Sequence, residues 1–237
     1  MNKYITSLLL CCLILFSACA SETIYGKAPI YDLTLKETYS VKAGDSLYSI
    51  AWLYNLDYMD LAKINNIKAP YGVVVGQKIT LNESIEPGFI SSKVSKKTNA
   101  VAKKAHEKHQ KNTQLKKIIW QWPIASRVFK SDIILGASRG IDIAEKYNEN
   151  IYSAASGTVV YNGSGIKGYG NLVIVKHSNS VLTAYGYSSK SLVKENQKVR
   201  KGQKIALVGK DLNGKAVLHF EIRENGKSVS PVKVLPV

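Results

Sequence analysis

One histidine and one aspartate lie in short segments typical of β-strands, and both side chains can bind a metal ion. His219 lies in Val217–Arg223, whose apolar positions are typical of a buried strand. Asp142 lies in Gly136–Ala144, a second predicted strand. A catalytic zinc needs three protein ligands and an open position for water. This pair alone is one ligand short of a catalytic zinc site.

The two segments together resemble the two halves of the zinc site in LytM-type (lysostaphin-type) peptidoglycan endopeptidases. In that family the first half carries a His four residues before the Asp. The second half reads His-x-His followed by Phe-Glu-Ile. The resemblance implies that Asp142 and His219 are remnants of the ligand set, with Ser138 at the position of the first His.

Two further positions of the family pattern have also lost their histidines. Val217 stands for the first His of His-x-His, and Tyr187 for the further catalytic His. Neither valine nor a tyrosine with its usual pKa of about 10 moves protons at neutral pH. We therefore expect a peptidase fold that is not an enzyme, with no catalytic residue, no metal and no cofactor.

Composition limits the other possibilities. The chain has 237 residues, enough for one large or two modest domains, and its net charge of +16 favours anionic partners. Its three cysteines, Cys11, Cys12 and Cys19, all lie at the N-terminus. The remainder has no disulfide framework and no thiolate ligand or nucleophile.

The N-terminus reads as a secretion signal. Lys3 precedes the apolar run 5–16, and Leu15-Phe16-Ser17-Ala18-Cys19 resembles a bacterial lipobox. The resemblance implies a signal peptide at 1–18, lipidation of Cys19 and a tether at 19–37. Ala20 after the cysteine favours the outer membrane, with the chain at its periplasmic face. Secretion argues against nucleic acid as a partner. An ordinary signal peptide or a membrane anchor is the alternative.

Residues 38–83 predict a strand, two helices and a second strand. Strands are expected at 39–43 and 75–81, with Asp45 or Ser46 capping the first helix. This βααβ order, with Gly-Asp-Ser-Leu and an Asn pair, resembles a LysM domain, which binds N-acetylglucosamine-containing glycan strands. The resemblance places glycan contacts at Gly44, Asp45, Ser46, Leu47, Ile67, Ala69, Pro70 and Tyr71. Gly44 could instead serve only a turn, and Asp45 only a cap.

Residues 84–117 have no apolar period and are rich in lysine, which predicts a solvated, self-repelling linker. His106 and His109 lie in it, but they lack a third ligand, so a metal site is not expected.

Residues 118–237 contain short β-rich runs separated by Gly, Asn and Ser, among them 120–124, 157–161, 171–177, 181–187 and 205–209. Their order resembles the LytM fold from end to end. His177 falls at a position that the family does not use as a ligand, so we expect a structural or surface role. The expected architecture is a small α+β (βααβ) LysM domain followed by an all-β LytM-type (lysostaphin-type) domain.

A lipobox, a LysM domain and a LytM domain depleted of histidines together resemble murein hydrolase activators. The resemblance implies activation of a periplasmic N-acetylmuramoyl-L-alanine amidase during septal wall splitting in cell division. The expected amidase-binding groove consists of Ser138, Arg139, Tyr169, Tyr187, Val217, His219 and Arg223. Two alternatives remain. One is a residual zinc endopeptidase that cleaves peptidoglycan cross-links, and the other is a non-regulatory cell-wall tether.

Overall fold

The computed structural model describes residues 38–81, 114–134 and 137–237. The signal peptide, Cys19 with its tether, and most of the predicted linker lie outside these ranges. None of the helices within them is long and apolar enough to cross a membrane. The described residues belong to one compact unit.

The βααβ domain forms as predicted. Strands β1 (Thr38–Ser40) and β2 (Lys78–Thr80) pair antiparallel, and helices α2 (Leu47–Leu53) and α3 (Tyr58–Ile64) lie between them in the sequence. Ser46 caps α2 in a capping box with Ser49, in which each hydroxyl oxygen accepts from the backbone N–H of the other residue. The strands are shorter than the apolar alternation predicted.

The Asn pair after α3 has a structural reason. The Asn65 side-chain amide donates to the carbonyl oxygens of Leu61 and Thr80, and its oxygen accepts from the Thr80 N–H. Asn66 adopts a positive φ of 55°, which asparagine tolerates better than most residues. The pair thus ends the helix and ties it to β2.

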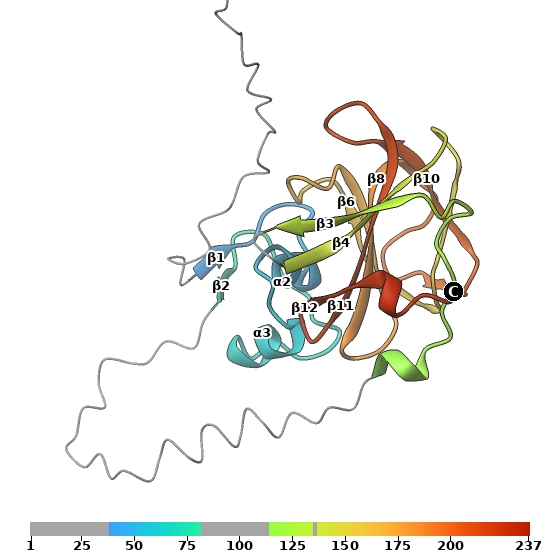
Figure 1. Ribbon diagram of the computed structural model, residues 1–237. Helices are drawn as coiled ribbons and strands as arrows, with labels where there is room; N and C mark the ends of the chain where they lie inside the picture. The colour runs from blue at the N-terminus through green and yellow to red at the C-terminus, as the bar shows by residue number, and fades with distance from the viewer. Residues whose placement is uncertain (1–37, 82–113, 135–136) are drawn as a thin grey trace, which may run out of the picture. The chain divides into compact units, whose positions relative to one another are not determined.

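The second domain is a ten-stranded sheet of antiparallel pairs, which confirms the expected β architecture (Figure 1). Its main order is β3-β4-β11-β10-β8-β7-β6-β9, and β11 also pairs with β8 and β12, and β10 with β5. The strands are β3 (Phe129–Ile134), β4 (Ala137–Ala144), β5 (Asn150–Tyr152), β6 (Gly157–Gly163), β7 (Asn171–Lys176), β8 (Val181–Ser191), β9 (Lys198–Val199), β10 (Lys204–Lys210), β11 (Ala216–Glu224) and β12 (Lys227–Val229). A short 3₁₀ helix, η2 (Pro231–Lys233), follows β12.

Strand β11 is covered on both faces. Leu218, Phe220 and Ile222 belong to the main apolar core. Because side chains alternate along a strand, His219, Glu221 and Arg223 point to the opposite face, and all three are buried. A row of three polar side chains therefore lies beneath the surface on that face.

A second apolar cluster joins the two domains. It contains Trp52, Leu61 and other residues of the βααβ domain together with Leu172, Ile174 and Leu182 of β7 and β8. The intervening β7 residues 173 and 175 belong to the main core instead. Both faces of β7 are thus buried, which explains its unbroken apolar run.

Two sequence expectations need correction. No strand forms at 120–124. Pro123 has no N–H to donate to a ladder, and the segment is held by single backbone hydrogen bonds, from the Gln121 N–H to the Ala154 carbonyl oxygen and from the Tyr152 N–H to the Pro123 carbonyl oxygen. The last residues assigned to the linker form the 3₁₀ helix η1 (Gln114–Lys117), and Leu115 is buried in the main core. The folded β domain therefore begins before Ile118.

Candidate functional site

The strand register brings the two remnant zinc ligands together. His219 of β11 pairs directly with Asp142 of β4, and on its other side with Gly186 of β8. The imidazole Nδ1 lies 2.7 Å from Asp142 Oδ1. Gly140 allows this close approach of the strands. It has φ +120°, and a Cβ there would lie 2.4 Å from the Phe220 carbonyl oxygen.

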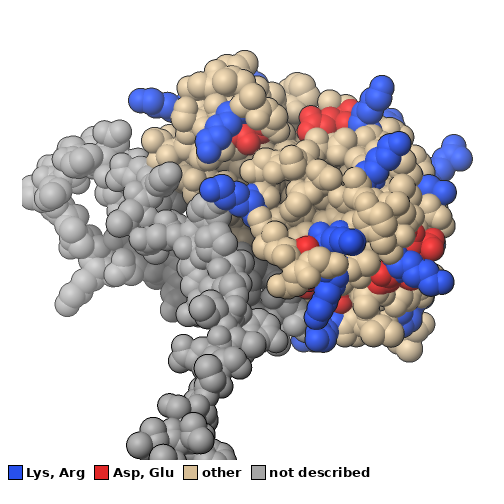
Figure 2. Space-filling model, turned by 90° about the horizontal axis from the view of Figure 1, so that it is seen from above, with Lys and Arg blue, Asp and Glu red and all other residues tan. Residues whose placement is uncertain are grey.

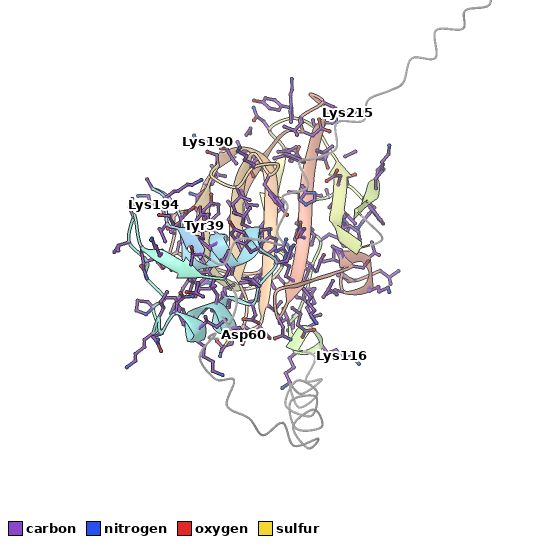
Figure 3. All side chains as sticks on the ribbon, turned by 90° about the vertical axis from the view of Figure 1, so that its left-hand side faces the viewer. Tyr39, Asp60, Lys116, Lys190, Lys194 and Lys215 are labelled. Atoms are coloured by element: carbon purple, nitrogen blue, oxygen red, sulfur yellow. The ribbon has the colours of Figure 1, made fainter. Side chains whose placement is uncertain are left out.

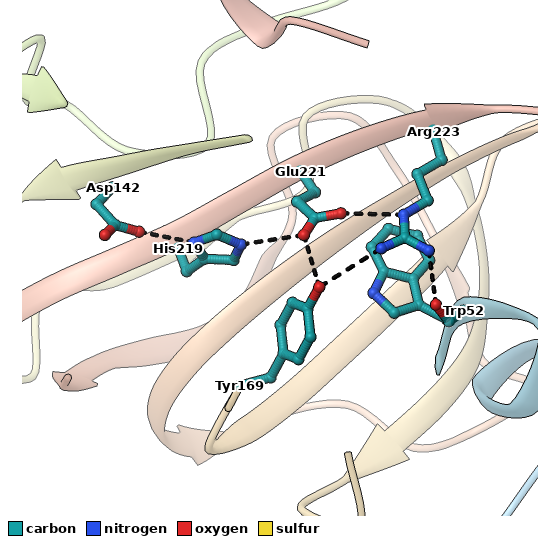
Figure 4. Close-up of polar contacts among 6 residues, drawn as sticks. All are labelled: Trp52, Asp142, Tyr169, His219, Glu221 and Arg223. Carbon is teal, nitrogen blue, oxygen red and sulfur yellow. Dashed lines mark hydrogen bonds and ion pairs between the residues drawn. The ribbon is translucent and has the colours of Figure 1, made fainter. Parts of the chain in front are cut away.

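His219 begins a chain of alternating charges along β11 (Figure 4). Its Nε2 lies 3.2 Å from Glu221 Oε1, and the other Glu221 oxygen accepts from Arg223 Nε at 3.0 Å. Together with Asp142, the order is carboxylate, imidazole, carboxylate, guanidinium. Each buried charge in this chain therefore has a partner of opposite sign, which offsets its loss of hydration.

The carboxylates on both edges of the ring keep His219 protonated. Burial alone lowers its pKa, but hydrogen bonds and charge attraction from Asp142 and Glu221 outweigh it and raise the pKa to about 10. For Glu221, burial raises the pKa, while Arg223 and His219 pull it down to about 2. Both groups are charged at neutral pH, so the imidazolium holds a positive charge between the two carboxylates.

Tyr169 and Trp52 close the far end of the chain. The Tyr169 hydroxyl donates to Glu221 Oε1 at 2.6 Å, and burial with the nearby Glu221 charge raises the Tyr169 pKa far above its usual range. The Arg223 guanidinium lies 3.7 Å from the Trp52 ring centroid and donates to the Trp52 carbonyl oxygen at 2.7 Å. Trp52 belongs to α2, so this contact joins the two domains.

The donor set does not fit a catalytic zinc ion. Asp142 and Glu221 contact opposite nitrogens of the His219 ring, so the three side chains do not converge on one point. Across the ranges that the structure describes, no group of three or more His, Cys, Asp or Glu side chains could hold a metal. The sequence positions expected to supply the missing histidines carry Ser138, Tyr187 and Val217.

The structure brings part of the expected groove together around His219. The rings of Tyr169 and Tyr187 lie 5.4 and 5.9 Å from the imidazole, both edge-on. Tyr187 is half-buried with φ 57°, and its N–H donates to the Tyr169 carbonyl. Val217 is buried two residues before His219 on the same face of β11. Ser138 and Arg139 lie on β4 by their backbone positions.

Arg223 does not occupy the solvated position expected of a groove residue. Its exposed fraction is 2%, since Trp52 lies over it. Glu221 and Trp52 were not predicted as members of the site. Because alternate residues of a strand lie on the same face, the spacing of His219, Glu221 and Arg223 could have indicated that Glu221 lies beside His219. No local pattern pointed to Trp52, since its partner lies 171 residues away in the chain.

The residues predicted to contact glycan have mixed environments. Gly44 is exposed with φ +84°, and Asp45 accepts from the Lys42 N–H and the Tyr39 hydroxyl. Leu47 is completely buried, so it supports the loop from below and cannot face a glycan. Ser46 donates to the Val160 carbonyl oxygen of β6 at 3.2 Å.

The second predicted glycan loop is more open. Ala69 and Pro70 are exposed, whereas Ile67 and Tyr71 are half-buried. The Tyr71 ring packs edge-on against the rings of Tyr48 and Tyr58. Tyr71 therefore joins this loop to a cluster of three aromatic rings.

Comparisons with known proteins agree with this arrangement. Residues 39–82 match the LysM domain model, and residues 136–231 match the model of peptidase family M23. The murein hydrolase activator NlpD of Salmonella dublin is 33% identical over 90% of this chain and 71% of its own length. The uncharacterized lipoprotein YgeR of Escherichia coli is 34% identical, over 84% and 80%. The outer membrane antigenic lipoprotein B of Haemophilus influenzae is 29% identical, over 84% and 64%. This chain, with a LysM domain before an M23 domain, belongs to the NlpD family of murein hydrolase activators.

Proposed function

We propose that this protein is a lipid-anchored activator that binds peptidoglycan glycan strands through its LysM domain. Its M23 domain stimulates a periplasmic N-acetylmuramoyl-L-alanine amidase and does not cleave the wall itself. The family membership and the order of the two domains support this reading. The process served is the splitting of septal wall during cell division.

The observation that carries the proposal is the closed state of the former zinc site. Both nitrogens of His219 are hydrogen-bonded to carboxylates, and Arg223 neutralises the second of these. A ring engaged on both edges has no free lone pair for a metal, and Val217 occupies the position at which the family pattern has a further histidine. The buried charges hold the site in a fixed arrangement beside Tyr169 and Tyr187, which suits a binding domain better than a hydrolase.

Around this site, tyrosines offer anchors for a partner protein. Tyr169 and Tyr187 are only half-buried, and tyrosine is enriched among the residues that dominate interface energies. We propose that the amidase binds over these two tyrosines. If an element of the amidase covers its own active site, differential binding by this surface shifts that enzyme toward its open state.

The proposed location follows from the N-terminal lipobox and from relatives named as lipoproteins, one of them an outer membrane lipoprotein. Acyl chains on Cys19 would hold the protein at the periplasmic face of the outer membrane. LysM binding then concentrates the activator and its amidase on the wall.

Dye release from labelled peptidoglycan tests the proposal. We expect the purified chain to release no dye alone and to raise the rate of the organism's own amidase several-fold. Tyr187→Ala should abolish the stimulation, whereas Tyr147→Ala, at a tyrosine that is 54% exposed in another part of the M23 domain, should retain it. Chelator-sensitive dye release by the chain alone would instead identify a zinc endopeptidase. Wall binding without stimulation would identify a simple tether.

A further inference from the structure

The M23 domain has a cavity that does not include Asp142 or His219. It has a volume of about 730 Å³, within the size range of pockets that bind small ligands. It opens where β6 begins, β7 ends and β9 lies alongside β6. Its lining residues are Ser156, Gly157, Thr158, Lys176, His177, Ser178, Asn179, Lys198, Val199, Arg200 and Gln203.

The sheet register sets two ammonium groups on either side of a threonine. Thr158 of β6 pairs with Lys176 of β7 on one side and with Lys198 of β9 on the other. Directly paired residues share a face of the sheet, so the two lysines and the threonine form a row. The two lysine backbones are then about 10 Å apart, two strand spacings. Both cations can therefore reach one small ligand.

The lining carries positive charge without compensation. Lys176, Lys198 and Arg200 are cationic, and no aspartate or glutamate is among the lining residues. The uncharged residues Thr158, Ser178 and Asn179 add hydrogen-bond donors. Three cations gathered around a cavity repel one another, and an anion with more than one acidic group relieves that repulsion.

His177 forms part of the wall and adds no charge. Its Nδ1 lies 2.9 Å from the Ser156 carbonyl oxygen, which fixes a proton on that nitrogen, and its Nε2 accepts from the Thr183 hydroxyl at 2.7 Å. Burial lowers its pKa to about 4, so the ring is neutral at physiological pH. The positive charge of the pocket therefore comes from Lys176, Lys198 and Arg200.

Lys176 connects this pocket with the LysM domain. Its ammonium group lies 5.7 and 5.8 Å from the ring centroids of Tyr48 and Tyr58. Both tyrosines pack against Tyr71 of the second predicted glycan loop. A wall polymer held at that loop therefore has the basic pocket within reach.

The net positive charge of the chain does not by itself identify this pocket as the anion-binding site. Figure 2 shows lysine and arginine side chains scattered over one face of the molecule, with acidic side chains beside several of them. A planar lipid surface would contact such protruding cations. Three cations gathered in one shallow pocket suit a short group with several carboxylates that projects from a polymer.

We propose that this basic pocket binds the carboxylates of the peptide stems of peptidoglycan while the LysM domain holds the glycan strand. The inference rests on the peptidoglycan binding proposed above and adds the recognised chemical group. Each stem is a short peptide with several carboxylates, which matches a shallow pocket with three cations. The LysM domain then binds the glycan strand and the M23 domain binds the peptide stems of the same polymer.

The test compares two variants that each lose two positive charges. Lys198→Gln/Arg200→Gln alters the pocket, and Lys190→Gln/Lys215→Gln alters exposed lysines outside it, which Figure 3 labels. All four side chains are exposed, so both variants should fold, and circular dichroism checks this. The probe is the soluble stem tripeptide L-alanyl-γ-D-glutamyl-diaminopimelate, titrated into the purified full chain by calorimetry.

We expect the unaltered chain and the control variant to bind the tripeptide equally, and the pocket variant to bind at least ten-fold more weakly. No binding by the unaltered chain, or equal weakening in both variants, would overturn the proposal. So would pocket-dependent binding to phosphatidylglycerol vesicles without tripeptide binding, which would assign the pocket to lipid. Amidase stimulation is measured in parallel, so that either proposal can fail while the other stands.

Discussion

His219 has the chemistry of a fixed cation. In a zinc peptidase a ligand histidine must be neutral, because its lone pair binds the metal. Here Asp142 and Glu221 stabilise the protonated ring, and the imidazolium ties the two strands together.

This arrangement predicts how stability depends on pH. The folded-state pKa of His219 is about 10, above the usual 6.5, so its contribution is complete below 6.5 and is lost as the pH rises toward 10. For Glu221 the folded-state pKa is about 2, below the usual 4.5. Its contribution is complete above 4.5 and is lost as the pH falls toward 2. These two groups therefore favour the folded state most between 4.5 and 6.5.

Nitrogen chemical shifts of the His219 ring provide the direct measurement, and urea unfolding provides the energetic one. We expect ring resonances of an imidazolium up to about pH 9 and a falling urea midpoint from about pH 7 upward. His177 is the internal control, since its ring should stay neutral throughout that range. A His219 titration with its midpoint near pH 6.5 would contradict the charge chain.

Arg223 is the second residue whose loss should be costly. Arg223→Ala removes the cation beside buried Glu221 and the guanidinium stacked on Trp52. We expect a loss of about 3–5 kcal/mol in unfolding free energy, the range for breaking a buried ion pair. Lys190→Ala, at an exposed site, should leave the urea midpoint unchanged. A small effect of Arg223→Ala would mean that Glu221 is neutral or solvated.

Between elements, the contact of β4 with β11 depends on one glycine. A side chain at Gly140 would meet the Phe220 carbonyl oxygen and the Glu221 side chain, and its φ of +120° disfavours any other residue. Gly140→Ala should therefore cost at least about 3 kcal/mol and move Asp142 away from His219. Gly72→Ala is the matched control, because no heavy atom lies within 4 Å of the added Cβ. Thermal unfolding of both variants gives the comparison. Equal melting temperatures would show that the backbone of β4 can shift to accommodate the added methyl group.

Most strands could be predicted from the sequence, because their residues alternate or form apolar runs bounded by Gly and Asn. Strand β11 is the best case, and the nearness of its His219 to Asp142 was implied by the family resemblance. The strand predicted at 120–124 does not form. Aromatic residues favour strands, but Pro123 cannot donate to a ladder, and the indoles of Trp120 and Trp122 donate to the carbonyl oxygens of Leu115 and Pro236. Leu115 was assigned to the linker because one apolar residue among lysines forms no pattern.

The candidate site was predictable only in part. Asp142 and His219 come together as expected, but the burial of His219, and the role of Glu221 between two cations, depend on packing from several strands. The unbroken apolar run of β7 was a sign that both faces of the sheet are covered. The run could not identify the covering element, because the covering residues belong to the LysM domain.

At the scale of the whole molecule, the LysM and M23 domains share a hydrophobic cluster and polar contacts. Trp52 lies on Arg223, and Ser46 donates to the Val160 carbonyl oxygen. The same α2 helix thus carries a predicted glycan residue at its cap and an interdomain anchor within it. Such packing ties the folding of the small domain to that of the large one.

Trp52 should therefore control whether the domains unfold together. It is 2% exposed, and Trp52→Ala removes an indole from the shared cluster and from the Arg223 guanidinium, at a cost of about 3–5 kcal/mol. We expect calorimetry to show one unfolding transition for the unaltered chain and two for Trp52→Ala, with the LysM domain unfolding first. Val75→Ala, at a LysM residue that is 70% exposed, should keep the single transition. Two transitions in the unaltered chain would show that the domains fold independently and that Trp52 serves only its own domain.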